Sequence, residues 1–319
     1  MNKRQSNIEL LRIISIFLIM VVHATYLTFG TPTPHEIQAK PLGSFFFIGL
    51  ENVSVICVDI FVLISGWFGI HPKVKSIGGL LFQCVYFGLI MAIFFGVTGI
   101  QPLGATTLAK CMVNYPHFVM CYIVMYLMTP VLNAFVEHAS RIQFRNMLIG
   151  LYSWAFIFGW FLHNDDSFAG GNSALAFMGL YLLARYIRIH CTFPARLQKA
   201  RVWGVIWLAN VLIVTAAVWA SSYFGFSLKV SNVLLNMTTS YLSPNVILAA
   251  ISLLMCFAHF EFKSTAVNRI AVSAFASVLT HGYAMNNVYI PLIQDLYKAS
   301  PFVTFLCEAV GIMLAYLII

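Results

Sequence analysis

Long apolar runs, each interrupted by only a few polar positions, repeat along the whole chain. Each run is roughly 17 to 25 residues long, the length that an α-helix needs to cross a bilayer. The pattern predicts ten spans, near residues 8–29, 45–70, 77–100, 117–136, 147–163, 173–189, 203–225, 243–260, 270–290 and 302–319. Their connections are short, so residues 1–319 are expected to form a single all-α domain, a polytopic membrane helix bundle.

Composition agrees with this pattern and excludes a soluble globular protein. Hydrophobic residues make up 61% of the chain and charged residues 9%, far from the usual balance of a soluble domain. The seven cysteines are scattered, without a C-x-x-C pair or the spacing of metal ligands. We interpret them as small apolar residues and expect no metal site.

The basic residues fall mainly on one side of the predicted spans. With a cytoplasmic N-terminus, fourteen of the eighteen Lys and Arg residues lie on the cytoplasmic side, and Lys40, Lys110, Lys229 and Lys298 lie outside. The positive-inside rule therefore predicts an even number of spans with both termini in the cytoplasm. This topology explains the net charge of +8, and no nucleic-acid partner is expected.

The first span carries ionisable residues on one face. The eleven residues from Arg12 to His23 turn a helix through ~1100°, about 20° past three full turns, and advance about 16 Å. Glu9 lies within ~40° of the same face. Arg12 is therefore expected near one membrane surface and His23 well inside, where ionisable groups usually face a protein interior or a wet cavity.

Three further ionisable residues are expected near the depth of His23. Glu51 and Asp59 lie on the second span and His281 on the ninth. A histidine held by a carboxylate has its other ring nitrogen free to accept a proton, which is the arrangement of a general base. The alternative is a histidine whose ring is simply satisfied by hydrogen bonds inside the bundle.

Basic residues at the cytoplasmic ends of the spans are candidates for binding phosphate. Arg185 and Arg188 share a helix face at the end of the sixth span, and Lys73 and Lys75 follow the second. Arginines spaced in this way can grip phosphate groups. Their alternative role is to anchor the topology.

Five segments resemble, in order, the motifs of acyltransferase family 3, a family of multi-span membrane O-acyltransferases of bacteria that modify surface polysaccharides. Arg12 and His23 match its R-x10-H motif, and Asp59-Ile-Phe-Val-Leu-Ile-Ser-Gly66 resembles its F-F-x-x-S-G segment. The other three are Met125-Tyr-Leu-Met-Thr-Pro130, Phe177-Met-Gly-Leu-Tyr-Leu-Leu183 and the stretch from Asn268 to His281. The resemblance covers nearly the whole chain.

The resemblance implies transfer of an acyl group, most often acetyl, from cytoplasmic acetyl-CoA to a hydroxyl of a surface or lipid-linked glycan at the bacterial inner membrane. His23, oriented by Glu51 or Asp59, is then the general base or a transient acyl carrier, and His281 takes the same role or aligns the substrate. Arg12 lies near the thioester, and the four other basic residues hold the phosphates of CoA. The competing interpretation is a proton-coupled transporter or flippase in which these ionisable residues form a relay.

Overall fold

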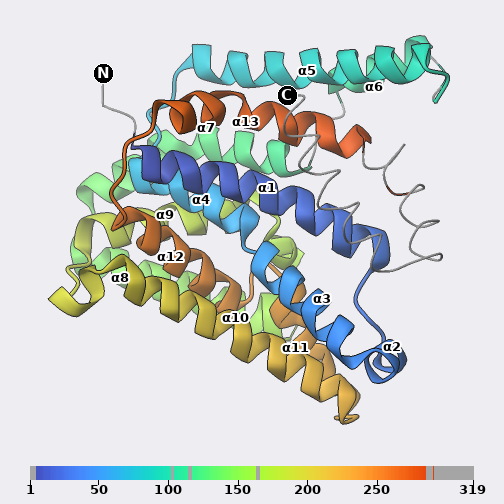
Figure 1. Cartoon of the computed structure of the whole chain (residues 1–319). Helices are drawn as coiled ribbons and strands as arrows, with labels where there is room; N and C mark the ends of the chain where they lie inside the picture. Colours follow the sequence, from blue (N-terminus) through green and yellow to red (C-terminus); the bar gives the residue numbers. More distant parts are fainter. Residues whose placement is uncertain are drawn as a thin grey trace.

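The computed structural model describes residues 5–100, 102, 104–113, 117–162, 166–284 and 290, and the described part contains helices but no strand (Figure 1). Its α-helices are α1 (Ser6–Phe29), α2 (Pro34–Ala39), α3 (Pro41–Ser54), α4 (Cys57–Phe68), α5 (Val74–Val97), α6 (Ala105–Val113), α7 (His117–His138), α8 (Arg141–Trp154), α9 (Ala174–His190), α10 (Ala200–Tyr223), α11 (Leu228–Thr239), α12 (Pro244–Ala258) and α13 (Thr265–Ala284). A π-helix, η1 (Ala155–Phe161), continues α8. Two 3₁₀ helices, η2 (Asp166–Gly171) and η3 (Ala195–Gln198), lie beside α9 in the chain.

Six helical segments of the described residues are long and apolar enough to cross a membrane, so the chain has the features of a membrane protein. They are Ser6–Tyr26, Pro41–Phe68, Val74–Val97, His117–His138, Ala200–Tyr223 and Lys229–Ala258. The predicted count of ten is not confirmed. Helices α8, α9 and α13 lie at three of the other predicted spans, but none of them is both long enough and apolar enough to be counted. The tenth predicted span, and the ninth beyond Ala284, lie outside the described residues apart from residue 290.

The second predicted span is two helices rather than one. Helix α3 ends at Ser54, and α4 begins at Cys57 after a turn at Val55 and Ile56. The Ser54 hydroxyl donates to the carbonyl oxygens of Leu50 and Glu51, a local bond that competes with the helix ladder and bends helices. The break lies between Glu51 and Asp59, so their relative depth does not follow from a single straight helix.

Helix α7 contains a proline whose missing N–H is compensated locally. Pro130 cannot donate to the carbonyl oxygen of Tyr126, its i−4 partner in a regular helix. The hydroxyl of Thr129 donates to this oxygen instead, at 2.6 Å. The helix therefore continues through Pro130 and keeps Tyr126 in position.

Helices α4 and α9 pack at unusually short range. A Cβ atom at Gly66 would lie 2.5 Å from the carbonyl oxygen of Tyr181 and 2.8 Å from Cβ of Ala184. No side chain larger than hydrogen fits there without a shift, so Gly66 sets this distance. Gly66 therefore allows α4 and α9 to pack closely.

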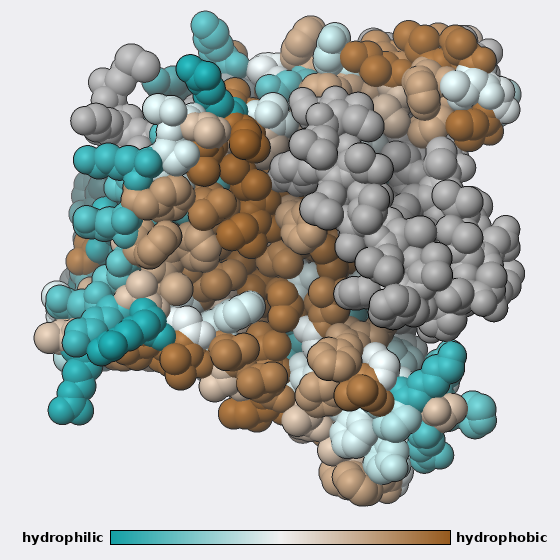
Figure 2. Space-filling model, viewed as in Figure 1, coloured by the Kyte–Doolittle hydropathy of each residue, from teal (hydrophilic) through white to brown (hydrophobic). Residues whose placement is uncertain are grey.

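Contacts between distant segments place several predicted cytoplasmic loops at one end of the bundle. The Ser264 N–H donates to the Ser6 hydroxyl and Asn7 Nδ2 donates to the carbonyl oxygen of Phe257, which puts the α12–α13 connection beside the start of α1. Residues of the α4–α5 connection contact the last two turns of α9. Figure 2 shows hydrophilic residues at the left edge and the lower right, with a hydrophobic belt between them.

Candidate active site

The side chains of His23 and His281 meet between α1 and α13. Nε2 of His281 lies 2.7 Å from Nδ1 of His23, and the two rings are nearly parallel, 26° apart with their centroids at 4.8 Å. Helix α1 packs along α13 over much of its length, and both histidines are partly buried. The expected meeting of His23 and His281 is therefore present in the structure.

The hydrogen bonds assign the protons of the neutral pair. Nδ1 of His281 lies 2.7 Å from the carbonyl oxygen of Val278 and 3.1 Å from that of Ser277. A carbonyl oxygen only accepts, so His281 carries its proton on Nδ1 and its Nε2 is an acceptor. His23 must then donate from Nδ1, which leaves Nε2 of His23 unprotonated and without a hydrogen bond among the described residues. A hydroxyl placed against this nitrogen would meet a base in the correct tautomer.

The carboxylate partner expected for His23 is not found. Glu51 and Asp59 are buried, and none of their four carboxyl oxygens has a hydrogen-bond partner among the described residues. An ionised carboxylate in that setting would lack a compensating donor, so neither side chain serves as the counter-ion of the pair. The described side chain that bonds Nδ1 of His23 is His281.

Arg12 is held beside a second polar cluster. Its guanidinium forms an ion pair of 2.7 Å with Glu9, one turn earlier on α1, and the side chain keeps 30% of its surface exposed. The hydroxyl of Tyr122, which interacts electrostatically with Arg12, lies 3.2 Å from the hydroxyl of Ser65. Helices α1, α4 and α7 therefore contribute to one polar cluster, which we call the Arg12 cluster: Glu9, Arg12, Ser65 and Tyr122.

The other basic candidates gather around the α4–α5 connection. The guanidinium of Arg188 lies over the ring of Trp67 at 4.5 Å, and that of Arg185 lies against Gly69. Gly69 has φ +76°, a conformation that favours glycine. Lys73 and Lys75 follow with exposed side chains. We call Lys73, Lys75, Arg185 and Arg188 the basic end.

Tyrosines that the sequence interpretation did not select tie the basic end to the bundle. Tyr181 accepts from the N–H of Ile70 at 3.0 Å and donates to Oδ1 of Asn133 at 2.6 Å. Tyr126 accepts from the N–H of Lys73 at 2.8 Å. Tyr126 and Tyr181 belong to motif-like segments, and this could have identified them in advance.

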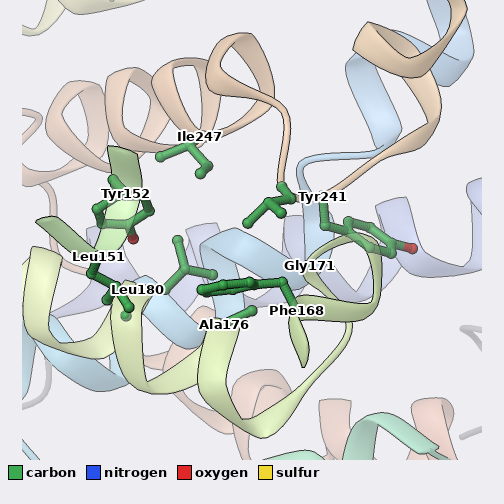
Figure 3. A pocket seen from close by; sticks show the side chains of 10 residues that line it. Leu151, Tyr152, Phe168, Gly171, Ala176, Leu180, Tyr241 and Ile247 are labelled. Atoms are coloured by element: carbon green, nitrogen blue, oxygen red, sulfur yellow. The ribbon is translucent and has the colours of Figure 1, made fainter. Parts of the chain in front are cut away.

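One enclosed cavity is too small to hold a substrate. It lies between the end of α8, the start of α9 and the residues before α12, and it measures about 10 Å³, about the volume that one water needs. Figure 3 shows the Tyr152 ring on one side and Tyr241 on the other, with the Tyr241 hydroxyl pointing away from the other lining side chains. This cavity is therefore not the active site.

No protein-family model, no curated protein and no solved structure matches this chain.

Proposed function

We propose that this protein is an integral membrane O-acyltransferase, which moves an acyl group, most often acetyl, from acyl-CoA to a hydroxyl of a cell-surface or lipid-linked glycan. The observation that carries the proposal is the His23–His281 pair, because its hydrogen bonds leave Nε2 of His23 unprotonated and without a partner among the described residues. The motif-like segments supply the reaction class. The bacterial inner membrane, with both termini in the cytoplasm, is the location that fits this donor and the distribution of basic residues.

In the proposed reaction His23 acts as general base. Its Nε2 takes the proton of the acceptor hydroxyl while the hydroxyl oxygen attacks the thioester carbonyl carbon. The new C–O bond forms, the C–S bond breaks, and the CoA thiolate leaves and takes the proton back from His23. His281 keeps Nδ1–H of His23 engaged throughout and so stabilises the transient imidazolium.

The basic end and Arg12 provide the charge that the donor requires. CoA carries several phosphate charges, and Lys73, Lys75, Arg185 and Arg188 gather at one end of the bundle. The guanidinium group of Arg can donate two hydrogen bonds to one phosphate group, whereas the ammonium group of Lys acts as a point charge. We assign phosphate binding to these four residues and the thioester region to Arg12.

One observation favours the alternative of a proton-coupled transporter or flippase. The carboxyl groups of Glu51 and Asp59 are buried in the bundle without hydrogen-bond partners among the described residues. Buried ionisable groups of this kind often mark proton relays in transporters. The proposed acyl transfer does not use them, so the two functions predict different results in a transfer assay.

The test follows the label of [acetyl-¹⁴C]acetyl-CoA in membranes that contain the protein and lipid-linked glycans. We expect release of free CoA and label in an alkali-labile ester with the wild type, and loss of both with His23→Gln. His259→Gln is the matched control, because Nδ1 of His259 also bonds a backbone carbonyl, that of Met255 at 2.8 Å, outside the pair. Equal transfer by His23→Gln at equal membrane level would remove His23 from the reaction, and no CoA release by the wild type would favour the transporter.

A further inference from the structure

A larger cavity lies between α4, α5, α7 and α13, away from the small cavity of Figure 3. Its volume is about 220 Å³, and much of its wall is aromatic, formed by Phe61, Phe118 and Phe275. Rings of these three residues pack against one another, at 5.5 Å between Phe61 and Phe118 and 6.4 Å between Phe61 and Phe275. The wall therefore has a defined shape and offers an apolar surface to a chain-like ligand.

Hydroxyl groups interrupt this aromatic wall on one side. Ser76, Tyr122 and Tyr126 line the cavity together with the rings. Tyr122 belongs to the Arg12 cluster, and Tyr126 is fixed by the backbone of Lys73. Tyr122 and Tyr126 already have protein partners, but each hydroxyl oxygen can accept a further hydrogen bond from a ligand amide N–H, which a lipid tail lacks.

The cavity adjoins the basic end on α5 and is also lined by α13, the helix that carries His281. Ser76 directly follows Lys75 in the chain. At the other side, Phe275 precedes His281 on α13 by six residues, or about 9 Å along the helix axis. A ligand with phosphates at the basic end could therefore enter the cavity and reach the helix that carries His281.

We propose that this cavity holds the amide-bearing pantetheine arm of the acyl donor, with its phosphates at Lys73 and Lys75 and its thioester directed toward the histidine pair. The inference rests on the proposed function, since it names the path of that donor.

The first experiment compares acetyl-CoA with acetyl-pantetheine, which lacks the nucleotide and its phosphates. Leu80→Trp fills the cavity from α5, where Leu80 lines it, and we expect the KM for both donors to rise at least tenfold. Leu80→Phe gives a smaller rise. Replacing both Lys73 and Lys75 by Gln is expected to raise the KM for acetyl-CoA alone.

The matched control is Ile93→Trp, on the same helix but ~140° around it from Leu80, with 48% of its surface exposed. It should change neither KM. If Leu80→Trp also leaves both KM values unchanged and loses a co-purified lipid detected by mass spectrometry, the cavity holds lipid and the inference is wrong. Equal unfolding midpoints show that the variants are folded.

A photoreactive diazirine analogue of acetyl-pantetheine tests the cavity without relying on catalysis. Labelling is expected on peptides of α5 and α7 in the wild type and should be lost in Leu80→Trp. Labelling without acyl transfer would retain the cavity inference as a binding site and reject the proposed function. Acyl transfer by the wild type with labelling outside α5 and α7 would support the proposed function and reject the cavity inference.

Discussion

His23 donates the hydrogen bond to His281 because two backbone carbonyl oxygens of α13 hold the ring proton of His281 on Nδ1. Those of Ser277 and Val278 fix the proton of His281 on Nδ1, and this fixes the tautomer of His23 in turn. The carbonyl oxygens determine the tautomer of His281, because a carbonyl oxygen can accept a hydrogen bond but cannot donate one. His281 is thus a positioning residue for the proposed base.

Removing the acceptor at residue 281 should lower the turnover number but not weaken donor binding. We expect His281→Leu to reduce kcat about 100-fold with little change in KM, within the range that general base catalysis contributes. His281→Gln places an amide oxygen near the position of Nε2 and should recover part of the loss. Steady-state kinetics of the three proteins measure this, and a variant that changes only KM would contradict it.

The sequence placed His23 and His281 at a similar depth, and their side chains do meet, but the carboxylate partner expected for His23 is not found among the described residues. The eleven-residue spacing is a property of one helix, and α1 is continuous from Ser6 to Phe29, so the prediction for Arg12 and His23 needed no tertiary information. The partner depends on how α13 and the broken α3–α4 segment pack against α1. Residues such as Ser54, which contribute to that break, give only a weak signal in the sequence.

At the scale of the elements, the contact between α4 and α9 places the Arg185 and Arg188 side chains beside the α4–α5 connection. Gly66 permits the close approach, and one turn later the guanidinium groups reach Trp67 and Gly69. A change in this helix distance would therefore move the basic end. Gly66 therefore links the stability of the α4–α9 contact to the proposed phosphate binding at the basic end.

Gly66→Ala should destabilise the protein by about 1–3 kcal/mol, the usual cost of overpacking. Its new methyl group would lie 2.5 Å from a backbone oxygen, which cannot move aside like a flexible side chain. Gly78→Ala is the control, since nothing lies within 4 Å of its Cβ position. Thermal unfolding in detergent measures both, and equal midpoints for the two variants would show that α4 and α9 can separate without cost.

Short helix α2 should depend on pH through its capping box. The Thr33 N–H and hydroxyl donate to the Glu36 carboxylate, each at 2.8 Å, and hold the pKa of Glu36 below its ordinary value of 4.5. A lowered folded pKa means that this stabilisation is complete above the ordinary value and is lost as pH falls through the lowered one. Protection factors for the Ile37 and Lys40 amides should therefore decrease at acid pH. Glu36→Gln should abolish the pH dependence, and an unchanged profile in this variant would assign it to another group.

For the whole molecule, the predicted cytoplasmic connections meet at one end, and a hydrophobic belt separates this end from the segment around α2 (Figures 1 and 2). Gln38 and Pro41 contact Tyr223 and Trp219 of α10 at the opposite end. The bundle thus has two polar ends of different charge. Such an asymmetry fits a fixed orientation in the membrane.

An epitope inserted beside Lys40 should be accessible from outside intact cells, and one beside Arg196 only after the cells are permeabilised. The physical reason is the excess of Lys and Arg at the end that includes Arg196. Antibody binding before and after permeabilisation measures this. The opposite pattern would invert the orientation and place the basic end away from cytoplasmic acyl-CoA.

Apolar periodicity was sufficient to predict the all-helical class and the approximate position of most helices. The predicted count of ten spans is not confirmed: α9 has only 17 residues, α8 changes to a π-helix at Ala155, and the tenth span lies outside the described residues. Where a helix ends or changes type depends on how it packs against its neighbours. A hydropathy window measures only the average composition of a segment, so it does not detect these ends and changes.

The distance along the chain between the two histidines has a consequence for biosynthesis. His23 and His281 are separated by 258 residues, and a ribosome makes α1 long before α13. During translation the first helix must remain in the membrane with His23 unpaired until nearly all the other described helices have been inserted. A nascent chain interrupted before α13 contains the proposed base but not the group that orients it, so such fragments should be inert.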